Sequence, residues 1–312
     1  MAEFRPPPDV FAAVMATGIV SIAASDHGYR WLSVTLAALA TVALPVLMVL
    51  TAAGHRTQPL DRRNPDVMVR LFSYVAACAV LGARYAEHRI VVWIFAGMAL
   101  QAWAILAPVV LRSMWRYRWT GLRDRARGAW ELAAVGTIGV AIVSAHSGWL
   151  FGALLFWMLG IVAYAAMTAL ILWRTVHERW DRDGFEPDSW ILMGGLAIAT
   201  LAGDHIHRIW PVGPVESVTK VTWVLATSWI PVLVFFSLRR VRRHREVLRV
   251  PTAWWAMVFP LGMYSAATFA MALETGWSWL AVVSLAFCWV ALVAWLAVVV
   301  VLAARGRSLR KG

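Results

Sequence analysis

Two stretches of the sequence carry side chains that could do chemistry. In the first, Asp204-His205-Ile206-His207-Arg208, a carboxylate and two imidazoles lie close together. Such groups can ligate a metal ion, and histidines at an entrance could respond to low pH. No second His, Cys or Asp group at ligand spacing accompanies them. We therefore interpret the cluster as the solvated end of a helix and predict no metal or cofactor. A membrane metalloenzyme using Asp204, His205 and His207 is the alternative.

The second stretch is Phe259-Pro260-Leu261-Gly262, in an apolar segment of mostly small residues. Pro260 lacks a backbone donor and clashes with the preceding turn, so it predicts a kink, which Gly262 would ease. A bulky ring beside a kink could plug a narrow passage, and Phe259 would then be a gate. Contact of Phe259 with lipid or with a neighbouring helix is the alternative.

The elements that must position these residues follow from the composition. Hydrophobic residues make up 61% of the 312 residues and charged residues only 15%, and the mean hydropathy is +0.67. These values exclude an ordinary soluble domain, and the longer apolar segments exceed the ~20 residues that cross a bilayer as a helix. We predict one membrane domain over 1–312. Its ten segments are 10–25, 31–53, 66–83, 90–111, 129–145, 149–173, 188–204, 217–238, 253–273 and 278–303.

The segments form a repeat of five units. Each unit is a helix rich in small residues, a short loop and a longer, more apolar helix, and the first helices begin at Phe11, Phe72, Trp130, Trp190 and Trp254. Like hairpins can close into a ring around an axis along the membrane normal. The predicted fold is therefore an all-α integral membrane protein with ten transmembrane helices, arranged as five helical hairpins in a quasi-fivefold ring around a central pore. Because removal of the first segment as a signal peptide would break this repeat, we expect it to be retained.

Small residues recur every four positions in the first helices of four hairpins, as in Ala13, Thr17, Ser21 and Ser25. Such stripes either allow close helix packing or line a narrow passage. Close packing is the simpler reading of any one stripe. Because the stripes recur in the first helices, the pattern favours an inner ring, with the second helix of each hairpin facing lipid.

Charge predicts the orientation. Of the 29 Lys and Arg residues, all but Arg30, Arg84, Arg89, Arg208 and Lys220 fall on the side that holds both termini. By the positive-inside rule these termini are cytoplasmic, in a multi-pass protein of the plasma or inner membrane. The same rule explains the net charge of +12 without a nucleic-acid partner. The two cysteines lie inside apolar segments and indicate neither a disulfide nor a metal site.

The middles of the ten segments contain no ionisable residue. Coupled transporters usually need a buried carboxylate or an unwound site, and cation channels favour acidic rings. A neutral passage with basic mouths suits anions better. Hydroxyls such as those of Thr17 and Thr137, together with helix dipoles, would then contact the anion.

Two motifs resemble the tellurite-resistance/dicarboxylate transporter family, which is related to the slow-type anion channels. They are the opening stretch from Pro7 to Ser21 and the Phe259–Gly262 stretch. The resemblance implies that the odd-numbered helices line a central pore in each copy of a homotrimer, and that Phe259 is the pore gate. It also implies a pore lining by small residues, whereas Phe72, Tyr74 and Cys78 make the third helix bulkier. The predicted lining and kink residues are Ala13, Thr17, Gly18, Ser21, Gly136, Thr137, Gly194, Gly195, Pro260 and Gly262.

The sequence thus predicts a transport protein, not an enzyme, that passes small anions through a Phe-gated central pore in the lipid bilayer. The candidate anions are C4-dicarboxylates such as malate and inorganic oxyanions such as tellurite or sulfite. The alternative on the same fold is a proton-coupled exporter of these anions.

Overall fold

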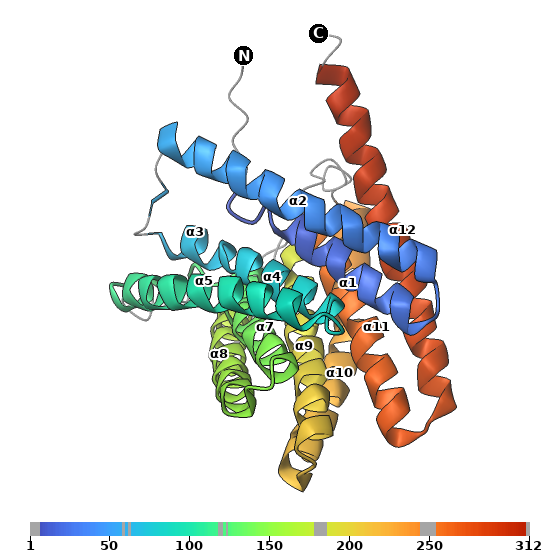
Figure 1. Ribbon diagram of the computed structural model, residues 1–312. Coiled ribbons are helices and arrows are strands. Elements are labelled where there is room, and N and C mark those ends of the chain that lie inside the picture. Colours follow the sequence, from blue (N-terminus) through green and yellow to red (C-terminus); the bar gives the residue numbers. More distant parts are fainter. Residues whose placement is uncertain are drawn as a thin grey trace.

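The computed structural model describes residues 7–57, 60–61, 64–117, 121–122, 124–177, 186–243 and 254–309. Most of these residues are helical, and no strand occurs among them (Figure 1). Five shorter helices, here called the inner helices, alternate along the chain with five longer outer helices. The inner helices are α1 (Ala12–Asp26), α4 (Phe72–Arg84), α7 (Leu132–His146), α9 (Ile191–Ile209) and α11 (Trp255–Thr275). The outer helices are α2 (Arg30–Thr57), α5 (Arg89–Trp115), α8 (Leu150–His177), α10 (Gly213–Arg243) and α12 (Ser278–Leu309).

Short helical pieces precede three inner helices. They are α3 (Pro65–Arg70) before α4, η1 (Gly128–Glu131) before α7, and η2 (Pro187–Trp190) before α9. With these pieces included, nine helical stretches of the described residues are long and apolar enough to cross a membrane, and α1 is a shorter apolar helix. The all-helical membrane class is as predicted. Several helices run further than their apolar segments, and the seventh ends at Ile209 rather than at residue 204.

The chain turns within each inner–outer pair at one end of the bundle, which we call the short-loop end. Gly28, Gly148 and Gly276 lie in three of these turns with φ of 77°, 83° and 73°. Glycine adopts this left-handed conformation without a steric penalty and commonly ends helices. The opposite end, where one pair connects to the next, is the long-loop end. Parts of its predicted arginine-rich segments, including Arg62, Arg63 and residues 244–249, lie outside the described residues.

Each inner helix packs against its own outer helix and against two other inner helices. Among the inner helices, α1 packs against α4, α4 against α7, α7 against α9, and α9 against α11. The circuit closes because α11 also packs against α1. We compare the most apolar 18 residues of each membrane-crossing stretch. All of them are buried in the stretch formed by η1 and α7, and 94% are buried in the stretch formed by η2 and α9. In the outer helices the buried share is only 17% to 33%. The outer helices therefore provide most of the apolar surface available to lipid.

Indole N–H groups connect four outer helices to the inner helix of the next pair. The bonds run from Trp103 to Thr137 Oγ1 (2.8 Å), from Trp157 to the Ala199 carbonyl (2.8 Å), from Trp223 to Thr268 Oγ1 (3.1 Å) and from Trp295 to Thr17 Oγ1 (2.8 Å). The last bond joins the last helix to the first. Because each such bond satisfies a polar group in an apolar environment, the set ties the outer helices to the inner ones.

Replacing Trp295 by phenylalanine is expected to lower the free energy of unfolding by about 1 kcal/mol, the usual contribution of one hydrogen bond. The measurement is denaturant unfolding of purified protein in mixed micelles. Trp115, whose side chain is 85% exposed, supplies the matched control, and Trp115→Phe should unfold at the wild-type midpoint. Equal midpoints for both variants would show that the Trp295 bond adds no stability.

Candidate functional site

A narrow cavity lies where the five inner helices meet. All five helices contribute to its lining, which includes Ile22 of α1, Val80 of α4, Ile142 of α7, Leu201 of α9 and Met263 of α11. Every lining residue is apolar or glycine, and the space open to a water molecule is about 10 Å³. That volume is at the lower limit for holding a single water. The cavity is therefore a narrow apolar constriction of the kind that blocks ions by excluding water.

Phe259 lies one helical turn from this constriction. Its side chain is fully buried, and it precedes the cavity-lining Met263 by four residues on α11. Residues four apart share a helix face, so Phe259 lies on the long-loop side of the cavity. Pro260 lies inside α11, which continues through it as one helix. The role of Phe259 as a gate stays a prediction at this position.

The hydroxyls of Thr17 and Thr137 point toward outer helices. Each donates to the carbonyl four residues earlier, at 2.7 Å. Each also accepts an indole N–H at 2.8 Å, from Trp295 for Thr17 and from Trp103 for Thr137. Both hydroxyls are therefore hydrogen-bonded within the protein, and their contact with a passing anion stays a prediction. Four-residue spacing defines a helix face but does not say which neighbour that face meets.

The predicted glycines lie at close helix contacts. A Cβ added to Gly18 would lie 2.8 Å from Val80 Cγ1, and one on Gly136 would lie 2.8 Å from Phe72 Cδ1, both on α4. Contacts this short require glycine for packing. The cavity lining does not include the small residues expected there, which are Ala13, Thr17, Gly18, Ser21, Gly136, Thr137, Gly194 and Gly195, nor Pro260 and Gly262.

The prediction that the Asp204 cluster is a solvated helix end holds for Arg208, whose side chain is 52% exposed, but not for Asp204. Asp204 is only 2% exposed, and α9 continues past it to Ile209. Its Oδ2 lies 2.9 Å from Arg208 Nε and 3.9 Å from His205 Nδ1. The His205 ring lies against the ring of His146 on α7, with centroids 4.5 Å apart.

This cluster also bears on the metalloenzyme alternative. Within the described part of the chain, no group of three or more His, Cys, Asp or Glu side chains is placed to hold a metal ion. Asp204 instead pairs with Arg208. Asp204, His205 and His207 therefore do not form the ligand set that a metal centre needs.

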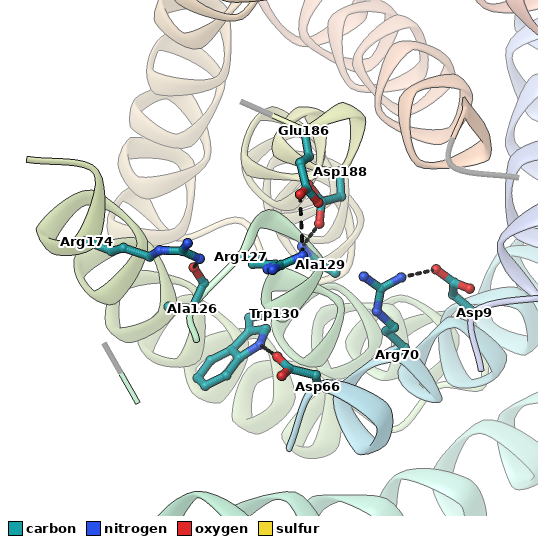
Figure 2. A network of polar contacts seen from close by, with 10 residues as sticks. All are labelled: Asp9, Asp66, Arg70, Ala126, Arg127, Ala129, Trp130, Arg174, Glu186 and Asp188. Carbon is teal, nitrogen blue, oxygen red and sulfur yellow. Dashed lines mark hydrogen bonds and ion pairs between the residues drawn. The ribbon is translucent and has the colours of Figure 1, made fainter. Parts of the chain in front are cut away.

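A network of polar contacts joins the inner-helix entries at the long-loop end (Figure 2). Arg70 pairs with Asp9 at 2.6 Å, the Trp130 indole donates to Asp66 at 2.6 Å, and the Ala129 N–H donates to Asp188 at 3.1 Å. Arg127 pairs with Glu186 at 3.4 Å, and Arg174 donates to the Ala126 carbonyl at 3.1 Å. Each of the three aspartates bonds to a neighbouring hairpin, so the network holds four of the five inner-helix entries together.

A repeated dipeptide in the sequence marks this network. The dipeptide Pro-Asp occurs at 8–9, 65–66 and 187–188, each time just before or within the first turn of an inner-helix stretch. Proline suits the first turn of a helix and aspartate complements its positive end. Each of these aspartates bonds to a neighbouring hairpin, although the donor is a guanidinium, an indole or a backbone N–H.

These features define the class of the protein. It is a multi-pass, all-helical membrane protein in which five shorter helices meet at an apolar constriction. The chain matches the voltage-dependent anion channel family over residues 5–303 and belongs to that family.

Relatives of the chain include membrane proteins of two microorganisms. An uncharacterized membrane protein of Mycobacterium tuberculosis is 31% identical over 139 residues, which cover 42% of this chain and 71% of the relative. An uncharacterized transporter of Methanocaldococcus jannaschii is 21% identical over 293 residues, which cover 84% of this chain and 82% of the relative. The family and the transporter relative indicate a transporter or channel rather than an enzyme.

Proposed function

We propose that this protein passes small anions along the axis of its inner helices. The observation that carries the proposal is the constriction lined by residues of all five inner helices, in a chain of the voltage-dependent anion channel family. The continuous circuit of inner-helix contacts supports a quasi-fivefold ring of five hairpins. The proposed cargo is a C4-dicarboxylate such as malate or an inorganic oxyanion such as tellurite or sulfite.

The proposed pathway is closed by apolar side chains rather than by a charged filter. The cavity lining holds no charged residue, and Phe259 lies directly on its long-loop side. Passage then requires the constriction to widen and fill with water. An uncharged passage binds anions weakly, which favours turnover over tight selection.

The arginine-rich long-loop end is proposed to face the cytoplasm, with both termini on that side of the cell membrane. The distribution of Lys and Arg supports this orientation by the positive-inside rule. The exposed apolar residues of the outer helices would contact lipid and, in a homotrimer, two further copies of the chain.

A flux panel in reconstituted vesicles tests the function. Malate, sulfite, tellurite, nitrate and chloride are each loaded, and efflux is followed with and without an imposed voltage. At least one anion is expected to leave faster than from protein-free vesicles, with a rate that responds to voltage. Rates equal to those of protein-free vesicles for every anion would overturn the proposal.

A proton-coupled exporter of the same anions is the second candidate, and Glu131 favours it. The Glu131 side chain is fully buried; its Oε1 accepts from Thr168 Oγ1 at 2.7 Å, and its Oε2 has no hydrogen-bond partner among the described residues. Buried carboxylates in membrane domains often carry protons. Coupling predicts that a proton gradient drives transport of the anion against its concentration gradient. Glu131→Gln should abolish this uphill transport and preserve anion exchange down the gradient. Uphill movement that persists in Glu131→Gln would exclude Glu131 as the coupling group.

A further inference from the structure

Four inner helices carry an ionisable residue one helical turn beyond a residue that lines the cavity. Asp26 follows Ile22, and Arg84 follows Val80, each by four residues. In the same way, His146 follows Ile142 and His205 follows Leu201, each by four residues. Residues at this spacing lie above one another on the same helix face. Asp26, Arg84, His146 and His205, here called the collar, therefore lie over the cavity at its short-loop end.

Interactions between the helices support this placement. The rings of His146 and His205 lie 4.5 Å apart, from the neighbouring helices α7 and α9. The Asp26 carboxylate interacts electrostatically with Arg84 and with Arg208. In the contact circuit α1 and α9 are not neighbours, so the interaction of Asp26 with Arg208 reaches across the mouth of the cavity.

Arg84 is held in a fixed orientation. Its Nε donates to Ser21 Oγ at 2.8 Å and its Nη2 to Ser33 Oγ at 2.9 Å. Each serine hydroxyl in turn donates to the backbone carbonyl of the other, at 3.0 Å and 2.8 Å. Because arginine does not lose its proton in proteins, this network fixes a permanent positive charge where α4 meets α1 and α2, one turn beyond the cavity-lining Val80. The third nitrogen of the guanidinium group, Nη1, takes no part in these bonds.

The charges around the collar nearly balance when the histidines are neutral. Arg84 and Arg208 face the carboxylates of Asp26 and Asp204, and α11 adds Glu274, which interacts with Asp204 and His207. On α10, Glu216 and Lys220 form an ion pair with each other. His27 at the end of α1 is bonded to Ser284 Oγ at 2.8 Å, and its burial lowers its pKa. Protonation of His146 and His205 would therefore add positive charge at the mouth.

We propose that the collar is an anion-binding entrance whose affinity depends on protonation of the His146–His205 pair. Two imidazolium groups this close repel each other, and an anion bound beside them and Arg84 relieves that repulsion. Anion binding and protonation therefore favour each other, and by linkage each strengthens the other to the same extent. The ligand is a small anion, which the collar binds more tightly in acid. This inference rests on the proposed anion transport.

The test measures the half-saturating anion concentration for flux in vesicles at equal inner and outer pH. The probe is the anion of the panel with the largest flux. Coupling of ordinary size predicts a half-saturating concentration about tenfold lower near pH 5.5 than near pH 7.5 in the wild type. The double variant His146→Gln/His205→Gln should lose this pH dependence. Because variant and wild type are compared with the same anion, any titration of the anion itself cancels.

His88→Gln is the matched control, because His88 is an exposed histidine at the same end of the bundle and its loss should preserve the wild-type pH dependence. Arg84→Gln should raise the half-saturating concentration at both pH values. Two results would overturn the proposed role of the collar. One is a half-saturating concentration that is the same at both pH values in the wild type. The other is a folded double His variant that keeps the pH dependence. Should the double variant not fold, His205→Gln alone must weaken the dependence. If no panel anion crosses at all, the proposed function itself fails.

Discussion

Replacing Phe259 by alanine is expected to increase anion flux about tenfold or more. The side chain is fully buried and lies one turn from a cavity that has room for at most one water molecule. Deleting the ring would leave a void one turn from the cavity-lining Met263 of α11. A wider, more readily hydrated passage removes the dewetting barrier that an apolar constriction imposes. Flux of the preferred anion in vesicles of matched protein content measures the effect.

Phe287→Ala is the control for this experiment. Phe287 of α12 packs edge-on against Tyr264 of α11, with ring centroids 4.6 Å apart, so its removal also takes a ring from the surroundings of α11 but on the outer side. Its flux should equal that of the wild type. Loss of a buried Phe costs about 3–5 kcal/mol of stability, so the abundance of folded Phe259→Ala must be measured. Unaltered flux at normal abundance would mean that Phe259 is not the gate.

Gly128→Ala is expected to destabilise the fold by about 3 kcal/mol, at the upper end of the usual overpacking cost. A Cβ on Gly128 would lie 2.6 Å from the Ser189 nitrogen and even closer to the carbonyl of Asp188. These are backbone atoms, so no side-chain rotation can relieve the clash. The entries η1 and η2 would have to separate, which would break the bond from the Ala129 N–H to Asp188.

The yield of folded protein from membranes and the midpoint of unfolding in mixed micelles measure this loss. Gly97→Ala on α5 is the matched control, because a Cβ there meets nothing within 4 Å. It should be neutral or slightly stabilising, since alanine has the higher helix propensity. If Gly128→Ala matched this control, the η1–η2 contact would not hold the long-loop end together.

The sequence by itself determined the helices and the membrane class. Apolar runs long enough to cross a bilayer, repeated in five like units, require backbone hydrogen bonds to be made within each helix. The positions of the helices could therefore be predicted from local information. The family could be recognised as well, because its motifs are short runs of neighbouring residues at Pro7–Ser21 and Phe259–Gly262.

Only the tertiary structure decided what each helix face contacts. The four-residue stripe through Thr17 was visible in the sequence, but the indole that bonds to Thr17 lies 278 residues away on α12. Asp204 ends an apolar run, yet it is only 2% exposed in the folded protein. The contact between the rings of His146 and His205 likewise depends on the contact of α7 with α9. Helix periodicity specifies which residues share a face, whereas the neighbour of that face follows from the packing of helices distant in sequence.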